Sequence, residues 1–270
     1  MDALSNRKLI YLDTNVISDL CKTGDLLNKF MARYPPNEDY LLSFSTYSMY
    51  EISKSAKFYG QFKQLYSIFP CVVVMSYFPL AMKEIELVAG KCETVNPILL
   101  SPVGIRIKGK KLNPDSLDIL MEMPEVKNGL SSVEEYTSEY FQEISELLDH
   151  PVFMSIKSTI RNNRNLFLRR FALYEMRVRF LFSEDREIEP LKLKKIKSLE
   201  MLAYCIYYKF FSDPNRKISV NDIVDALIMT TVPYVHTFIS ERNSIDILRK
   251  VKKQTSLINR VDLLTLSDIR

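Results

Sequence analysis

Five acidic residues near the two ends of the chain stand where their carboxylates could meet: Asp13, Glu51, Asp222, Asp225 and Glu241. Asp13 and Glu241 each directly follow a short apolar run that predicts a buried strand. Glu51 lies about one helical turn beyond the end of another such run. Asp222 and Asp225 are three residues apart on a predicted helix, so both can face the same side. The positions predict one acidic site built from both ends of the chain.

Clustered carboxylates point to a hard divalent cation. Carboxylates that lie close together raise each other's pKa unless a cation joins them. All-oxygen sites suit Mg²⁺ or Mn²⁺, and the sequence has only two histidines, which have no neighbouring histidine. Such an ion can lower the pKa of a bound water and neutralise a phosphodiester. The acids therefore predict phosphodiester hydrolysis with Mg²⁺ or Mn²⁺ as cofactor.

Short apolar runs that alternate with helical patterns predict the elements that position these acids. The predicted strands cover residues 8–12, 41–45, 71–75, 236–240 and 261–266. A helical pattern follows the first run and is broken at residues 34–36, and we expect Thr14 and Thr46 to cap the first two helices. The alternation predicts a parallel sheet with helices on its faces. Because the strands' carboxyl ends share one edge, Asp13, Glu51 and Glu241 are expected there.

The middle of the chain breaks this alternation. Residues 93–130 carry turn signals at four prolines, and helical patterns cover 133–148, 152–182 and 191–211. Further helices over 219–232 and 243–253 restore the alternation near the end. We therefore expect one discontinuous α/β domain, 1–92 with 216–270, and an inserted, mainly helical subdomain, 93–215.

A basic segment in the middle could bind nucleic acid. Between Lys157 and Lys197, 12 Lys and Arg residues stand against 5 Asp and Glu residues, and aromatic residues are interleaved with them. At about 100° per residue, Arg161, Arg164 and Arg169 share a broad helix face, with Arg179 further along. The alternative is a helix whose aromatics are core and whose arginines are its solvated side. A second basic stretch holds Arg106, Lys108, Lys110 and Lys111.

Four segments of the sequence resemble the PIN-domain nucleases. They are IYLDTNVISDL at 10–20, SFSTYSMYEISK at 43–54, NDIVDALIMTTVPYV at 221–235 and TFISERNSIDILRK at 237–250. The resemblance covers about residues 7–90 and 216–268, and the segments stand in the family's order. It implies a PIN-like three-layer domain with a central parallel sheet.

The resemblance also implies roles for individual residues. Asp13 corresponds to the family's first acid, Glu51 to the second, and Asp222 or Asp225 to the third. The implied metal ligands are Asp13, Glu51, Asp222 and Asp225, with Glu241 as a further catalytic acid. Asn15 and Ser240 would support the site. Glu241 stands where the family usually has aspartate, which departs from the pattern.

These observations predict a metal-dependent endonuclease that leaves a 5′-phosphate and a 3′-hydroxyl, with RNA favoured over DNA as substrate. The family implies a toxin or defence effector, held in check by an inhibitory or complex partner protein. One alternative is a degenerate PIN-like module that binds nucleic acid or protein without cleavage. Another is a phosphatase-like enzyme that acts on small phosphate esters.

Composition limits the other possibilities. The chain is 47% hydrophobic and 26% charged, which is typical of a globular protein with a sizeable core. A net charge of +4 permits a polyanionic partner. Scattered cysteines argue against zinc, and no Gly-rich phosphate motif is present. With no signal peptide or membrane-length apolar run, the sequence predicts a cytoplasmic protein without a membrane partner.

Overall fold

Two compact units make up the chain. The computed structural model describes residues 7–36, 39–100, 115–149, 159, 162–180, 195–211 and 219–269. The first unit, here the sheet unit, comprises Met1–Met75, Pro97–Val133 and Tyr234–Arg270. The second, the helical unit, comprises Ser76–Asn96 and Glu134–Pro233. These limits differ from the predicted domain boundaries, but compactness does not show whether a segment was inserted, so the insertion of 93–215 stays a prediction.

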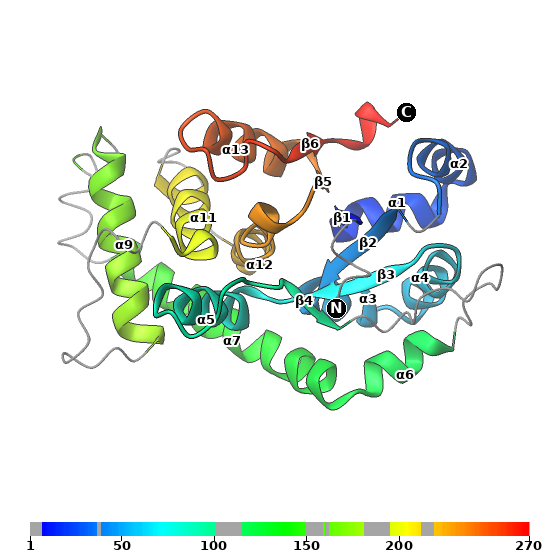
Figure 1. Ribbon diagram of the computed structural model, residues 1–270, viewed down its shortest axis with the longest axis horizontal. Coiled ribbons are helices and arrows are strands. Elements are labelled where there is room, and N and C mark those ends of the chain that lie inside the picture. Colours follow the sequence, from blue (N-terminus) through cyan, green and yellow to red (C-terminus); the bar gives the residue numbers. More distant parts are fainter. Residues whose placement is uncertain are drawn as a thin grey trace. The chain divides into compact units, whose positions relative to one another are not determined.

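The sheet unit is built on a mixed six-stranded sheet with strand order β4-β3-β2-β1-β5-β6 (Figure 1). Its strands are β1 (Lys8–Leu12), β2 (Tyr40–Ser45), β3 (Cys71–Val74), β4 (Ile98–Leu100), β5 (Thr237–Ile239) and β6 (Asp262–Leu264). All neighbours pair in parallel except β4, which is antiparallel to β3. The predicted α/β class is therefore confirmed, and five strands run parallel.

The sheet departs from the predicted parallel arrangement at one edge, where β4 is antiparallel. β4 comes from the segment in which the sequence shows mainly turn signals, and it pairs Leu100 with Val73 and Ile98 with Val74. Only three residues long and preceded by Pro97, this strand is too short to stand out as an apolar run. Its place at the sheet edge fits a proline neighbour, because an edge strand tolerates a missing donor.

Several helices of the sheet unit begin within a few residues after the end of a strand. They are α1 (Thr14–Lys22), α2 (Gly24–Arg33), α3 (Thr46–Ser53), α4 (Ala56–Ile68), α6 (Ser116–Glu122), the first part of α7 (Pro124–Asp149) and α13 (Arg242–Lys252). The one helix expected before residue 34 is two, because the chain leaves helical geometry at Thr23. The caps lie one residue earlier than expected: Asp13 and Ser45, not Thr14 and Thr46, accept the first amides.

Alternation along the strands creates the core of the sheet unit. Ile10 and Leu12 of β1 face the same side as Leu42 and Phe44 of β2, and helices α1, α2 and α4 pack on that side. Tyr11 points to the opposite face, where its ring stacks on Phe238 of β5 at 5.3 Å. Both faces of the central strands are buried, as expected for parallel strands that carry near-continuous apolar runs.

Helices make up most of the described part of the helical unit. They are α5 (Tyr77–Val88), the second part of α7, α9 (Arg164–Arg179), α11 (Lys197–Ile206), a π-helical turn η1 (Tyr207–Phe211) and α12 (Val220–Met229). The predicted helices 133–148 and 219–232 correspond to α7 and α12. The predicted helices 152–182 and 191–211 are described only in part, the first as α9 and the second as α11 with η1. No helix in the described part of the chain is long and apolar enough to cross a membrane.

A buried glutamate fixes the start of α11. Glu84 on α5 is fully buried and accepts hydrogen bonds from the Ser198 backbone amide, at 3.0 and 3.1 Å, and from the Ser198 hydroxyl. The first amides of a helix have no partner within the helix, and its N-terminus favours negative charge. Glu84 therefore joins α5 to α11 within the helical unit (Figure 1).

A second buried glutamate forms the centre of a polar cluster. Glu175 on α9 accepts hydrogen bonds from Tyr77 at 3.1 Å and Tyr140 at 3.0 Å. Arg179 lies 3.6 Å from Glu175, and its guanidinium stands over the Tyr140 ring at 4.3 Å. Burial raises the pKa of Glu175 to about 7, although Arg179 and the two hydroxyls act in the opposite direction.

This cluster predicts stability that decreases as the pH rises. The folded protein keeps the Glu175 proton up to about pH 7, whereas an unfolded chain loses it near the ordinary glutamate pKa of 4.5. Raising the pH across that interval removes the proton first from the unfolded state and so stabilises that state. The Glu175 contribution to the free energy of unfolding should therefore fall by up to about 1.4 kcal/mol per pH unit.

Urea denaturation between pH 4.5 and 8 of the parent and of Glu175→Gln measures this contribution. The side-chain amide of the Glu175→Gln variant cannot ionise, so its free energy of unfolding should not show this decrease. Between pH 4.5 and pH 8 the variant should therefore lose less stability than the parent. Glu139→Gln, an exposed residue of the same unit, is the matched control and should behave like the parent. Parallel pH profiles for parent and Glu175→Gln would contradict a raised pKa.

Candidate functional site

Asp13 lies where β1 ends, and β5 brings it a partner from the other end of the chain. The parallel register pairs Leu12 with Ile239, so the residues that follow, Asp13 and Ser240, lie next to each other. The Asp13 amide donates to the Ile239 carbonyl at 3.0 Å, and the Ser240 hydroxyl donates to Asp13 Oδ2 at 2.5 Å. Both side chains are buried, Asp13 with 7% exposure. The strand pairing therefore fixes the Asp13 carboxylate.

Thr14 connects Asp13 with Glu51. The Thr14 amide donates to Asp13 Oδ1 at 2.7 Å, and the Thr14 hydroxyl donates to Glu51 Oε2 at 2.5 Å. Glu51 lies in the second turn of α3 and is half-buried. Two of the predicted acids, from the ends of β1 and β2, thus meet at one threonine. The sequence predicts Thr14 only as a cap, because nothing local reveals a contact with a residue 37 positions away.

A network of buried hydroxyls lies beside this site. The Tyr11 hydroxyl is 2.9 Å from the hydroxyls of Ser45 and Ser48 and accepts from the Ser45 amide at 3.3 Å. Burial raises the pKa of Tyr11 far above its usual value, and the charge of Asp13 acts in the same direction. The phenol therefore stays protonated at neutral pH and can donate a hydrogen bond. This network connects β1, which Asp13 directly follows, with β2 and with the start of α3, the helix that carries Glu51.

Glu241 and Asn15 are the exposed neighbours of this site in sequence. Glu241 directly follows Ser240 and is the N-cap residue of α13, where its side chain makes no capping hydrogen bond. Asn15 is the second residue of α1 and is exposed. The structure places both residues next to site residues along the chain, and their predicted roles stay predictions.

Asp222 and Asp225 belong to the helical unit. Both lie on α12, and both contact one ammonium group: Lys209 Nζ is 3.4 Å from Asp222 Oδ1 and 2.7 Å from Asp225 Oδ2. The predicted common face is thus confirmed by a shared partner. Asp222 also forms a capping box with Ser219 at the start of α12. The structure brings Asp13 to Glu51 in one unit and Asp222 to Asp225 in the other.

The described residues hold no ready-made metal centre. Within the ranges that the structure describes, no three or more His, Cys, Asp or Glu side chains are grouped closely enough to hold an ion. The sheet unit contributes the pair Asp13 and Glu51, and the helical unit contributes the pair Asp222 and Asp225. The predicted metal ligands therefore form two carboxylate pairs.

The four arginines predicted to bind nucleic acid have different surroundings. Arg161 lies outside the described residues, as do Arg106, Lys108, Lys110 and Lys111. Arg169 is exposed on α9. Arg179 is 9% exposed, contacts Glu143 at 2.5 Å and stands over two tyrosine rings, so it also has a structural role within the helical unit.

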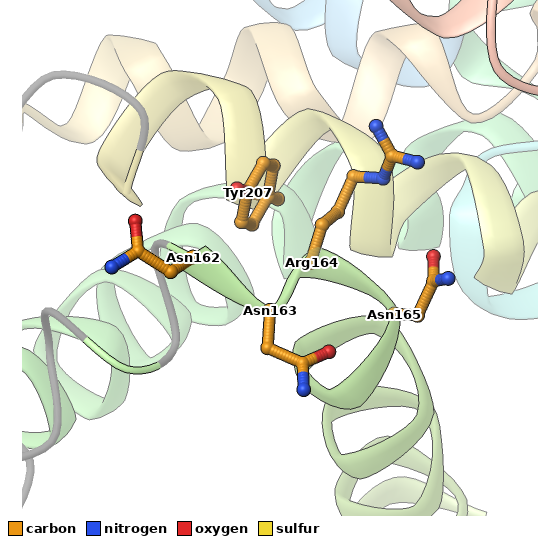
Figure 2. A pocket seen from close by; sticks show the side chains of 5 residues that line it. All are labelled: Asn162, Asn163, Arg164, Asn165 and Tyr207. Carbon is orange, nitrogen blue, oxygen red and sulfur yellow. The ribbon is translucent and has the colours of Figure 1, made fainter.

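Arg164 lines an open pocket at the start of α9. The pocket has a volume of about 330 Å³ and is lined by Asn162, Asn163, Arg164, Asn165 and Tyr207. Figure 2 shows the three asparagine side chains pointing in different directions around the first turn of the helix, while the arginine extends towards the Tyr207 segment. Asn163 caps α9, because its side chain accepts the Leu166 amide at 3.1 Å. Arg164 Nη1 donates to the Tyr208 hydroxyl at 3.4 Å.

Comparison of the chain with protein-family models, curated proteins and solved structures finds no match. The geometry of the two units is therefore the basis on which a function can be assigned.

Removing the Ser240 hydroxyl tests how Asp13 is held. Ser240→Ala takes a donor from a buried carboxylate, so we expect it to lower the free energy of unfolding by about 1–3 kcal/mol. Urea denaturation at pH 7 measures the change. Ser240→Thr keeps a hydroxyl and is the matched control, with a smaller loss expected. A parent-like unfolding midpoint for Ser240→Ala would mean that the hydroxyl does not stabilise Asp13.

Proposed function

We propose that this chain is a Mg²⁺- or Mn²⁺-dependent endonuclease with a PIN-like sheet unit, and that it hydrolyses phosphodiester bonds of RNA. The observation that supports this most is the meeting of Asp13 and Glu51 at Thr14, beside Ser240. Parallel strands end there, and ligands of open α/β sheets bind outside the carboxyl ends of the strands.

The side chains at this site fit a hard cation. Asp13 and Glu51 offer carboxylate oxygens, the ligands that Mg²⁺ and Mn²⁺ prefer. Ser240 and Thr14 contribute hydroxyl and amide donors, which orient the carboxylates and bring no net positive charge of their own. Asp13 and Glu51 would hold the ion, which when bound would acidify water and neutralise the phosphodiester.

The other residues of the chain have supporting parts in this proposal. Ser240 and Thr14 keep Asp13 in one orientation, and burial of Asp13 limits competition from bulk water. Glu241 is exposed beside Ser240, so its carboxylate is accessible to a substrate or an ion. Asp222 and Asp225 are the predicted acids of the helical unit, and their contribution to cleavage is tested by single asparagine variants.

Asp13→Asn should abolish metal-dependent cleavage while the fold persists. The amide is nearly isosteric but is a poor ligand for a hard cation. Because loss of a residue that merely supports a metal ligand costs about 10–100-fold, we expect a loss of more than about 100-fold for a ligand itself. Incubation with mixed RNA and DNA pools, with Mn²⁺ or with EDTA, measures cleavage and identifies the substrate.

Asp19→Asn, on α1 close to Asp13 in sequence, is the matched control and should cleave like the parent. Thermal melting adds a second measurement, because an ion that binds only the folded state raises its melting temperature. Mn²⁺ should raise the melting temperature of the parent but not of Asp13→Asn. Full activity in Asp13→Asn would refute the site. Nucleic-acid binding without metal-dependent cleavage by the parent would instead support the binding-module alternative.

The predicted basic face gives the proposal a substrate-binding test. Replacing Arg161, Arg164 and Arg169 together by alanine should weaken RNA binding. The slope of log affinity against log salt should fall by about 0.7 for each phosphate that an arginine no longer neutralises. Arg170→Ala is the control, because Arg170 is an exposed arginine of the same helix that lies about 100° around the helix axis from Arg169. Affinity and salt slope equal to the parent's would show that these arginines are a solvated face only.

A further inference from the structure

Lys209 is a fully buried lysine whose ammonium group lies against two of the predicted metal ligands. Its exposure is 0%, and Nζ lies 2.7 Å from Asp225 Oδ2 and 3.4 Å from Asp222 Oδ1. A buried ammonium is costly unless it is paired and hydrogen-bonded. The two carboxylates are therefore the charged, hydrogen-bonding partners of this buried ammonium group within the helical unit.

The packing of the π-helical turn explains why the ammonium is there. η1 contains Tyr207, Phe210 and Phe211, all buried, and the ring of Phe211 lies 4.5 Å from that of Phe167 on α9. These aromatic contacts fix the turn within the helical unit, and Lys209 belongs to the same turn. α11, which leads into η1, packs against α12, the helix that carries both acids (Figure 1). The aromatic side chains thus fix the position of the lysine independently of its charge.

The second oxygen of Asp222 is also occupied. Asp222 Oδ2 accepts from the Ser219 amide at 3.1 Å and from the Ser219 hydroxyl at 2.8 Å, and the Ser219 hydroxyl accepts the Asp222 amide at 3.3 Å. This reciprocal capping box holds the start of α12. Asp222 therefore uses one oxygen for the helix cap and the other for the lysine, whereas the Asp225 side chain is 30% exposed.

We propose that Lys209 is the resident cation of the Asp222 and Asp225 pair and takes the place that a divalent metal ion would need there. The pair carries two negative charges and the ammonium neutralises one of them at hydrogen-bonding distance. A divalent ion between the same oxygens, Asp222 Oδ1 and Asp225 Oδ2, would meet this positive charge. Asp222 could offer the ion its other oxygen only by giving up the capping box of α12. The helical unit thus positions a lysine with its two acids, and metal binding belongs to Asp13 and Glu51 of the sheet unit.

This proposal for Lys209 rests on the proposed nuclease function and removes Asp222 and Asp225 from the predicted metal ligands. The test of the proposal does not depend on cleavage activity. The full chain is titrated with Mn²⁺, and electron paramagnetic resonance measures the free Mn²⁺ at each step. The difference between added and free Mn²⁺ gives the number of ions bound per chain. Asp225→Asn should bind as many Mn²⁺ ions as the parent. Lys209→Met, which keeps the length of the side chain and removes its charge, should gain one Mn²⁺ ion per chain. Lys209→Met/Asp225→Asn should lose that gain.

Lys195→Met is the matched control, because Lys195 is an exposed lysine of the same unit and its replacement should create no Mn²⁺ site. Lys209→Met can unfold without metal, since two close carboxylates would then repel each other. Thermal melting with and without Mn²⁺ covers that case, and folding restored by Mn²⁺ supports the proposal. If the variant stays unfolded in both conditions, the stoichiometry of Asp225→Asn decides.

Two outcomes would overturn the proposal. Fewer Mn²⁺ ions bound to Asp225→Asn than to the parent would show that the pair binds metal despite Lys209. A folded Lys209→Met variant that gains no Mn²⁺ would show that the pair is no latent metal site. Failure of the proposed nuclease function has a different signature, namely equal Mn²⁺ binding by the parent and Asp13→Asn.

Discussion

The parallel pairing of β1 with β5 is the constraint on which the candidate site depends. The pairing joins residues 227 positions apart, such as Asp13 and Ser240. Such a long separation is tolerated because the entropic cost of closing a loop rises only slowly with the length of the loop. The pairing is fixed at both ends: the Leu9 amide donates to His236 Nδ1 at 3.0 Å, and the Asp13 amide donates to the Ile239 carbonyl. Burial lowers the pKa of His236, which favours the neutral ring with an accepting Nδ1 that this contact requires. A shift of the register by one residue would turn Ser240 away from Asp13.

Local patterns were sufficient to predict five of the six strands of the sheet. The apolar runs at 8–12, 41–45 and 71–75 became β1, β2 and β3 because strands buried on both faces need such runs, and the C-terminal runs became β5 and β6. The same runs placed Asp13 at a strand end. Local patterns missed β4, a strand of three residues. They also placed the first caps one residue late, because adjacent Asp-Thr and Ser-Thr pairs offer two candidate caps each.

The contacts that give the acids their chemistry could not be predicted from local patterns. Spacing showed that Asp222 and Asp225 share a helix face, but the partner on that face, Lys209, lies among aromatic residues of a π-helical turn. A lysine in such a segment is normally expected to reach solvent, and only tertiary packing shows that it is buried. Thr14 is a similar case, since its two hydrogen bonds join a neighbour in sequence to a glutamate on another helix.

The two acid pairs of the chain differ in the groups that orient them. Asp13 and Glu51 accept hydrogen bonds from hydroxyls and a backbone amide, which fix the direction of a carboxylate oxygen and carry no charge of their own. At Asp222 and Asp225 the donor is an ammonium, which fixes the direction and neutralises charge as well. Two pairs of acidic residues can therefore lie opposite donors of different charge, and their spacing in the sequence does not reveal this difference. The donors also come from different distances along the chain. Ser240 is 227 residues from Asp13, whereas Lys209 is 13 residues from Asp222 and 16 from Asp225.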